Sequence, residues 1–235
     1  MQPYFQDDAV TLYHADARDI LPQLAPGSVD LILGDPPYNI GKKYGAKSND
    51  NKPEAEYWAW FRECFTLASK AMTTGYLYVS HSDKGVYAAK PVLEDIGFSY
   101  IQTLIWWGRN GYSMQLHRKT WSFRHEPILF MSKGEPAPLN AGEAGMWYTT
   151  VIEVPRPQSN FAEGRCHPTQ KPLGLYRTLL QRTPGGTVLD FCAGSGTAGL
   201  AAKHLGRKAI LIEIEEEYCE EIVKRMAQGV LLGEA

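Results

Sequence analysis

The chain has no long hydrophobic run and few cysteines, and both absences narrow its class. No apolar stretch approaches the roughly 20 residues that a membrane-spanning helix needs, and the amino terminus lacks the basic-then-apolar pattern of a signal peptide. The 4 cysteines among 235 residues form no Cys-x-x-Cys pair, and no histidines cluster at metal-ligand spacing. We therefore expect a cytoplasmic protein with no membrane contact, no disulfide framework and no bound metal.

A strong net charge is also lacking, because 24 basic residues nearly balance 26 acidic residues and leave a net charge of −2. An even spread would argue against a nucleic-acid partner, since phosphate contacts need a positive face. The spread is uneven: residues 101–182 carry ten basic residues against five acidic ones, whereas residues 190–235 carry five against eight. Phosphate contact, or an ordinary solvated surface, is predicted for Arg109, His117, Arg118, Lys119 and Arg124.

Short β-branched and aliphatic runs alternate with amphipathic stretches along the chain, which predicts an α/β fold with a parallel sheet. The predicted strands are residues 10–14, 29–33, 75–80, 100–107, 122–132, 187–190 and 208–212. The predicted helices are residues 17–24, 53–72, 84–96, 173–181, 198–205 and 216–226. The proline- and glycine-rich run 134–166 breaks this alternation, so we predict one domain over residues 1–235 with a small target-recognition insert there.

One motif, Asp190-Phe191-Cys192-Ala193-Gly194-Ser195-Gly196-Thr197, closes a buried strand and opens a helix. Its glycines let the backbone approach a bound nucleotide or nucleoside, because side chains there would collide with the ligand. Glu213 ends the next predicted strand, where a carboxylate can accept hydrogen bonds from both ribose hydroxyls. The alternatives are a tight turn without a ligand or, because Gly199 supplies a third glycine in spacing, a dinucleotide site for NAD or FAD.

A second motif, Asp35-Pro36-Pro37-Tyr38, follows the apolar run 29–33. An exocyclic base amine is a poor nucleophile, because its lone pair is delocalised into the ring. The Asp35 carboxylate and the Pro36 carbonyl can accept hydrogen bonds from its two N–H groups, while the two prolines fix the backbone and Tyr38 can stack on the base. The alternative is a rigid turn with an exposed tyrosine, but open α/β sheets bind ligands at this position.

With both motifs in this order, the chain resembles the β group of S-adenosylmethionine-dependent DNA amino-methyltransferases, the N6-adenine and N4-cytosine enzymes. The resemblance extends to three further segments: His14-Ala15-Asp16-Ala17, Arg124-His125-Glu126-Pro127-Ile128-Leu129 and His167-Pro168-Thr169-Gln170-Lys171-Pro172. It implies a Rossmann-like, seven-stranded, circularly permuted methyltransferase sheet, in which the catalytic motif precedes the cofactor motif. Ala15 stands where the family has glycine, and Cys192 lies within the glycine motif.

The resemblance also implies roles for these residues. Asp35, Pro36, Pro37 and Tyr38 form the catalytic set, and S-adenosylmethionine is expected to contact Asp16, Lys171, Asp190, Phe191, Ala193, Gly194, Ser195, Gly196, Thr197 and Glu213. The expected substrate is an adenine flipped out of double-stranded DNA, with a possible homodimer as the active form. From its composition, the polar run 41–52 is expected to be either a mobile loop that closes over the base or an idle surface loop, and His167 is not expected to be a catalytic base.

Alternatives for the substrate and for the class stay open at this point. Within the same chemistry, the substrate could be cytosine N4 in DNA or adenine N6 in RNA. A different class is a silent partner that keeps the cofactor fold for shape and binds an active subunit. The intact Asp35 argues against that class, because a silent copy has no need for the acceptor carboxylate.

Overall fold

The computed structural model describes residues 1–48, 50–110, 121–142, 148–159 and 164–228. The strands are β1 (Phe5–Gln6), β2 (Val10–His14), β3 (Leu31–Gly34), β4 (Gly75–Ser80), β5 (Ser99–Trp107), β6 (His125–Lys133), β7 (Val151–Glu153), β8 (Val188–Asp190) and β9 (Ala209–Glu213). The α-helices are α1 (Ala17–Ile20), α2 (Glu54–Ala71), α3 (Asp83–Asp95), α4 (Leu173–Arg182), α5 (Thr197–His204) and α6 (Glu216–Gln228), and a short 3₁₀ helix, η1 (Leu21–Gln23), follows α1.

Within the described residues these strands form a single sheet in the order β1-β2-β9-β8-β3-β4-β6-β5-β7. The expectation of seven strands is therefore wrong, because the sheet of the described residues already has nine. The two additional strands, β1 and β7, occupy the edges and are only two and three residues long. A segment that short shows no period-2 alternation in its sequence, so its pairing is decided by the neighbouring strand.

The sheet is mixed rather than parallel, which corrects a second expectation. Strands β2, β9, β8, β3 and β4 run parallel, but β6 pairs antiparallel with both β4 and β5. The physical reason lies in the chain order: β5 and β6 are consecutive strands that pair with each other, and such neighbours can pair directly as antiparallel strands, whereas a parallel pair needs a crossover connection. The antiparallel direction of β6 carries its first residues to the end of the sheet where the parallel strands finish.

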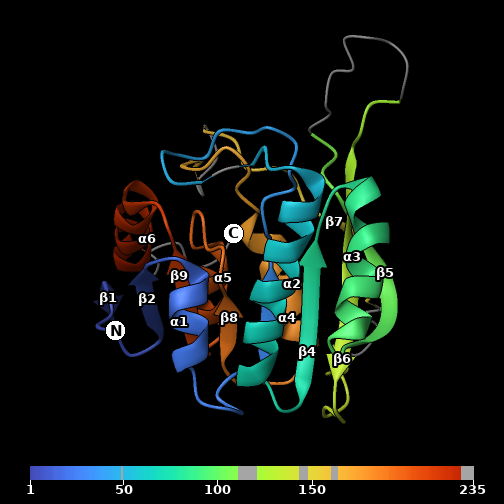
Figure 1. Cartoon of the computed structure of the whole chain (residues 1–235), viewed down its shortest axis with the longest axis horizontal. Helices are drawn as coiled ribbons and strands as arrows, with labels where there is room; N and C mark the ends of the chain where they lie inside the picture. The colour runs from blue at the N-terminus through green and yellow to red at the C-terminus, as the bar shows by residue number, and fades with distance from the viewer. Residues whose placement is uncertain (49, 111–120, 143–147, 160–163, 229–235) are drawn as a thin grey trace.

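Helices cover both faces of the sheet, as Figure 1 shows, with α1, α2 and α3 in front of it and α4 and α5 behind. Two buried clusters reflect these layers. One joins the sheet to α4, α5 and α6 through residues such as Leu175 and Ile222, and the other joins it to α1, α2 and α3 through residues such as Phe61. None of the described helices has the length and apolar character needed to cross a bilayer.

The arrangement brings the two sequence motifs together at one end of the sheet. Strands β3 and β8 are neighbours, with Leu31 opposite Val188 and Ile32 opposite Leu189, although their motifs lie far apart along the chain. Both are central and buried, and each ends where its motif begins. The carboxyl ends of β2, β3, β8 and β9, together with the start of β6, therefore define the region where a ligand would lie.

Candidate active site

A cavity of about 550 Å³ opens at this end of the sheet. Its volume falls within the usual range for small-molecule sites, roughly 300 to 1,000 Å³. The predicted residues that line it are Asp16, Asp35, Pro36, Pro37, Tyr38, Lys171, Asp190, Phe191, Ala193, Gly194, Ser195, Thr197 and Glu213. Gly196 instead lies behind the turn, where an added Cβ would come within 2.8 Å of Ile222. The two predicted half-sites are therefore parts of one cavity.

The glycine turn after β8 lies directly against the carboxylate that ends β9. Gly194 and Gly196 have φ angles of 51° and 70°, in the left-handed region that favours glycine. The backbone N–H of Gly194 donates to Glu213 Oε2 at 2.7 Å, and the N–H of Glu215 donates to Oε1 at 2.9 Å. Burial raises the pKa of Glu213 to about 7, although these hydrogen bonds oppose the rise. The carboxylate is thus fixed in orientation and faces the cavity.

The rest of the cofactor half is held by buried polar contacts. Asp190 accepts a hydrogen bond from the N–H of Cys192 at 3.1 Å, and burial raises its pKa to about 8. Thr197 Oγ1 donates to the carbonyl of Lys171 at 3.1 Å, and the buried Arg225 donates to the carbonyl of Ser195. These contacts tie the turn to the segment before α4 and to α6. These hydrogen bonds hold the turn in one conformation, so it is preorganised.

Asp16 begins α1 at the end of β2 and lines the same side of the cavity. Its carboxylate accepts from the backbone N–H of Arg18 at 2.9 Å and forms an ion pair with the Arg18 guanidinium at 2.7 Å. Hydrogen bonding to Arg18 is the main reason that the pKa of Asp16 is lowered. Asp16 therefore stays ionised with a fixed orientation beside the glycine turn.

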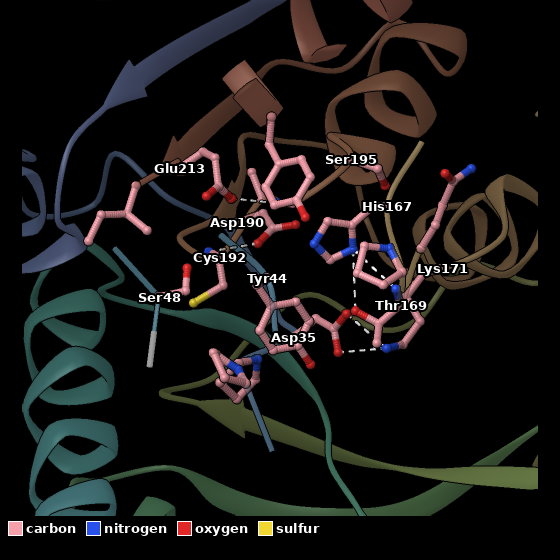
Figure 2. Close-up of a pocket in the computed structure, with 18 of the residues that line it drawn as sticks. Asp35, Tyr44, Ser48, His167, Thr169, Lys171, Asp190, Cys192, Ser195 and Glu213 are labelled. Carbon is pink, nitrogen blue, oxygen red and sulfur yellow. Dashed lines mark hydrogen bonds and ion pairs between the residues drawn. The ribbon is translucent and has the colours of Figure 1, made fainter. Parts of the chain in front are cut away.

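The reaction half centres on Asp35, which follows β3 directly. Lys171 Nζ lies 2.7 and 2.8 Å from the two oxygens of Asp35 and 2.9 Å from Oε1 of Glu126. Figure 2 shows the Asp35 carboxylate and the Lys171 ammonium facing each other, with Glu213 on the far side of the cavity. Lys171 was predicted to contact the cofactor, and its ammonium lies between the carboxylates of Asp35 and Glu126 at the wall of the cavity.

Tyr38 completes this group. Its hydroxyl lies 2.7 Å from Glu126 Oε1 and 3.0 Å from Asp35 Oδ1, and its ring stacks on His81 at 4.9 Å with 17° between the planes. The hydroxyl pins the ring at one edge and His81 covers one of its faces. The orientation of Tyr38 is therefore set before any ligand is present.

A hydrogen-bonded chain behind the prolines fixes the tautomer of His81. The backbone N–H of Ser82 donates to His81 Nδ1 at 2.8 Å, so this nitrogen is an acceptor and the proton of the neutral ring is on Nε2. Nε2 then donates to the Tyr57 oxygen at 2.7 Å, and the Tyr57 hydroxyl donates to the Pro37 carbonyl at 2.8 Å. Burial lowers the pKa of His81 to about 4, which keeps the ring neutral and this direction intact at neutral pH.

Replacing Tyr57 with phenylalanine is expected to lower kcat about tenfold, because the Pro37 carbonyl loses its donor and the turn loosens. The affinity for a ligand at the glycine turn should be unchanged, since the hydrogen bonds of the Tyr57 hydroxyl go to Pro37 and His81 rather than to that turn. Tyr76→Phe is a matched control: its hydroxyl also donates to a backbone carbonyl, that of Ala137 at 2.8 Å, but away from the cavity. Single-turnover rates of both variants check this, and an equal loss in both would contradict it.

The loop between β3 and α2 covers the cavity and is held near both ends. Close to β3, the carboxylate of Asp50 accepts from the backbone N–H groups of Asn39 and Lys42 at 2.6 and 2.8 Å. Further along, Glu215 at the start of α6 accepts from the N–H groups of Lys47 and Ser48. In between, the Tyr44 ring stacks on His167 at 5.5 Å with 8° between the planes. Figure 1 shows this loop lying across the carboxyl end of the sheet.

His167 packs against the glycine turn, where its ring lies 3.3 Å from the position of a Cβ on Gly194. Its pKa falls to about 4, chiefly because of burial and then because of the charge of Lys171. The ring is also enclosed by Tyr44 and Tyr218. These contacts are those of a neutral packing residue of the cavity wall.

Several site residues went unassigned at the level of the sequence: Glu126, Tyr57, His81 and Glu215. Glu126 carried a usable signal, because it is the one carboxylate in the otherwise apolar run 126–131. His81 follows a predicted strand directly and so belongs to the ligand-binding edge of the sheet. Tyr57 and Glu215 reach the site from a helix and a helix start, and only the tertiary packing reveals their contacts.

Among the phosphate candidates, Arg109 and Arg124 are both exposed at the end of the β5–β6 pair. Arg109 forms an ion pair with Glu153 at 3.1 Å, and Arg124 donates to the carbonyl of Arg109 at 3.0 Å. His117, Arg118 and Lys119 lie outside the described residues. The described part of the chain contains no group of three or more side chains suited to hold a metal ion.

Known proteins resemble this chain over nearly its whole length. The type II methyltransferase M.HpaI of Haemophilus parainfluenzae is 30% identical, with 90% of this chain and 72% of the relative covered. The DNA adenine methyltransferase YhdJ of Escherichia coli is 29% identical, with coverages of 94% and 84%. Among solved structures, the M1.HpyAVI–SAM complex matches with a TM-score of 0.73 at 26% identity, covering 92% of this chain and 98% of that one.

A further structural match and a family model complete the comparison. The cytosine-N4-specific PvuII DNA methyltransferase shares the fold, with a TM-score of 0.76 at 19% identity over 99% of this chain and 96% of that one. The family model for N6/N4 methyltransferases, described as DNA methylase, matches residues 29–224. That span includes both motifs and the residues that connect them, from β3 to α6. The chain therefore belongs to the N6/N4 DNA methylase family.

Proposed function

We propose that this protein transfers a methyl group from S-adenosylmethionine to the N6 amine of an adenine in DNA. The observation that carries the proposal is the single cavity in which the Asp35 carboxylate and the glycine turn with Glu213 both lie. The family supplies the class of reaction, DNA amino-methylation, and the geometry supports the roles proposed for the residues. The order of the motifs, residues 35–38 before residues 190–197, supports the circularly permuted arrangement.

The cofactor half has the features that a ribose-bearing cofactor requires. Gly194 has no side chain that would enter the cavity, and its φ of 51° directs its N–H to Glu213. Glu213 is nearly fully buried yet lines the cavity, so its oxygens can accept hydrogen bonds from ribose hydroxyls. When bound, S-adenosylmethionine supplies an electrophilic methyl group on a positively charged sulfur.

Asp35 would supply the hydrogen-bond acceptor that a weakly nucleophilic base amine needs in order to react. A hydrogen bond from the amine to the carboxylate, and a second to the Pro36 carbonyl, would hold both N–H groups and direct the nitrogen lone pair at the methyl group. The nitrogen would become positively charged as its bond to the methyl carbon forms, while the bond from that carbon to sulfur breaks and the cofactor product leaves as a neutral thioether. The nitrogen then loses one proton, which Asp35 or a water molecule accepts.

Adenine is favoured over cytosine by the motif and by one relative. In this family Asp-Pro-Pro-Tyr usually accompanies adenine N6 methylation, whereas Ser-Pro-Pro-Tyr is more typical of cytosine N4. Asp35 is the first residue of this motif here, and the relative YhdJ is named as a DNA adenine methyltransferase. The cytosine-N4-specific enzyme matches at only 19% identity, which supports the fold alone.

Target recognition is proposed for the segment 134–166, of which the structure describes residues 134–142, 148–159 and 164–166. Strand β7 adds this segment to the sheet beside β5, and Trp106 Nε1 donates to the Val154 carbonyl at 2.8 Å. Arg156 lies over the Trp106 ring at 4.5 Å and lines the cavity. The segment thus borders the place where a flipped base would enter.

A homodimer is also proposed. Sedimentation analysis of the full chain tests it, and a monomer mass in solution would contradict it.

The proposed function is tested by incubating the full chain with isotope-labelled S-adenosylmethionine and unmethylated duplex DNA. The DNA is digested to nucleosides, and mass spectrometry identifies the labelled base. N6-methyladenine is the expected product. N4-methylcytosine would retain the family chemistry but contradict the choice of base. If no label enters DNA, the DNA assignment fails, and adenine-containing RNA is the next substrate to test.

A further inference from the structure

We propose that Lys171 and Glu126 are positioning residues that together set the charge and orientation of Asp35. This inference rests on the proposed function of Asp35 as the acceptor for the base amine. Neither residue needs to touch the base, because both would act through the Asp35 carboxylate. Three features of the described structure carry the argument: the contacts, the burial and the charge of the group.

The contacts leave one part of Asp35 available to a substrate. Lys171 donates to both Asp35 oxygens, and Oδ1 also lies 3.0 Å from the Tyr38 hydroxyl. Among the described residues, Oδ2 accepts a hydrogen bond only from Lys171. Because each carboxylate oxygen accepts through two lone pairs, Oδ2 retains one for an incoming N–H group. Lys171 thus fixes the carboxylate plane while leaving an acceptor site for the amine.

Burial of the three side chains makes each of them dependent on its charged partners. The side chain of Lys171 is 4% exposed, that of Glu126 14% and that of Asp35 17%. A buried ammonium needs carboxylate partners, and two buried carboxylates that lie close together need a cation between them. Lys171 reaches this point because Thr197 holds its backbone carbonyl, and Glu126 reaches it because β6 runs antiparallel to β4. Each partner therefore comes from a separate part of the chain.

The charge of the group suits the reaction. With both carboxylates ionised and the lysine protonated, the three side chains sum to −1. Positive charge develops on the base amine during transfer, so an adjacent net negative charge stabilises the transition state. Without Lys171 the sum would be −2, and one buried carboxylate would take up a proton instead. A protonated Asp35 is a weaker acceptor and no longer compensates the charge on the amine.

The pKa shifts agree with this division of roles. Burial raises the pKa of Asp35, the charge of Lys171 lowers it and the charge of Glu126 raises it. The charged groups that also face the set are Lys42 and Arg156. The titratable groups nearby that are mostly neutral at pH 7 are Tyr44, Tyr57, His81, His167, Tyr176, Asp190 and Cys192. All of these remain in place when Lys171 or Glu126 is replaced, so differences between variants report on this pair.

The test compares the wild-type chain with Lys171→Met, Glu126→Gln and the double variant. The double variant matters most, because it removes one charge of each sign and restores the sum of −1. The readout is the titration of the Asp35 carboxyl carbon, observed by NMR with ¹³Cγ-labelled aspartate and assigned by its absence in Asp35→Asn. The pH dependence of kcat for methyl transfer is measured in parallel.

The expected order of the Asp35 pKa is lowest in Glu126→Gln, highest in Lys171→Met, and intermediate in the wild type and the double variant. The acid limb of the kcat profile should follow the same order, and Lys171→Met should lose about 100-fold in kcat at pH 7. A shared Asp35 pKa in all four proteins, with kcat lowered by a constant factor at every pH, would show a merely structural role and overturn the inference.

Two outcomes separate this inference from the proposed function. If the wild type transfers no methyl group to DNA, the proposed function fails, but the NMR titration still decides whether Lys171 and Glu126 control Asp35. If Lys171→Met does not fold, Glu126→Gln and the double variant still have to differ in the stated direction. Equal Asp35 pKa values in those two proteins would overturn the inference on their own.

Discussion

Replacement of Asp35 by alanine is expected to lower kcat for methyl transfer by about 1,000-fold or more, the loss of a preorganised charged partner of the reacting group. The base amine would lose its acceptor, while the glycine turn and Glu213 keep their contacts. The Kd for S-adenosylmethionine should therefore change less than about threefold. Single-turnover transfer rates and isothermal titration calorimetry measure the two quantities on the same preparation.

One structural feature and one control variant make this result specific. Lys171 also lies 2.9 Å from Glu126 Oε1, so it keeps a carboxylate partner when Asp35 is replaced and no isolated buried charge is left to unfold the protein. Asp95→Ala removes a carboxylate that is 67% exposed and, among the residues that the structure describes, pairs only with Arg62 on the surface, and its kcat should equal that of the wild type. Near-normal transfer by Asp35→Ala would refute the assignment of Asp35 as the acceptor for the amine.

The second large effect concerns the glycine turn, where Gly194→Val is expected to weaken binding of S-adenosylmethionine about 100-fold. The added side chain would start 3.3 Å from the His167 ring in a backbone conformation of φ 51° that β-branched residues rarely adopt. It would also project into the cavity where the cofactor is proposed to lie. Calorimetry on the purified variant gives the Kd, and a denaturation curve gives its stability.

The chain contains a matched control for the backbone strain. Gly206 has a similar φ of 63°, but an added Cβ there meets nothing within 4 Å, and the residue lies at the far end of α5. Gly206→Val should therefore share the cost of the backbone, about 1–2 kcal/mol in the free energy of unfolding, with the cofactor Kd unchanged. A similar loss of affinity in both variants would show that strain, rather than the turn itself, explains the result.

The central strands and both motifs were predictable, because their signals are local. The run 29–33 and the run 187–190 are short, apolar and followed at once by polar motif residues, and the structure has strands β3 and β8 there. The cavity brings Asp35 and Glu213 together for a general reason: parallel strands of one sheet present their carboxyl ends on the same side. Sequence spacing is enough for that inference.

The ion network was not predictable, because it depends on the direction of one strand. Glu126 meets Lys171 only because β6 runs antiparallel to β4, and no local signal in the sequence of β6 reveals that direction. Lys171 was expected to bind the cofactor, since its neighbours in sequence belong to the cofactor side. The direction of a long charged side chain depends on the charges near it in the folded protein. Here the Lys171 ammonium lies against the carboxylates of Asp35 and Glu126.

The strand order has a consequence for how the protein is made. Strands β2 and β3 are consecutive in the chain, yet β9 and β8 lie between them in the sheet. During synthesis β2 and β3 emerge long before β8. Either a gap of roughly 14 Å, three strand spacings, stays open between β2 and β3, or these two strands take their final positions only after β8 and β9 have emerged. Both edges of that gap are unpaired until residues 188–213 arrive. Strands β8 and β9, which leave the ribosome after β2 to β7, are thus inserted into the middle of the sheet, and the Asp35 turn meets the glycine turn only then.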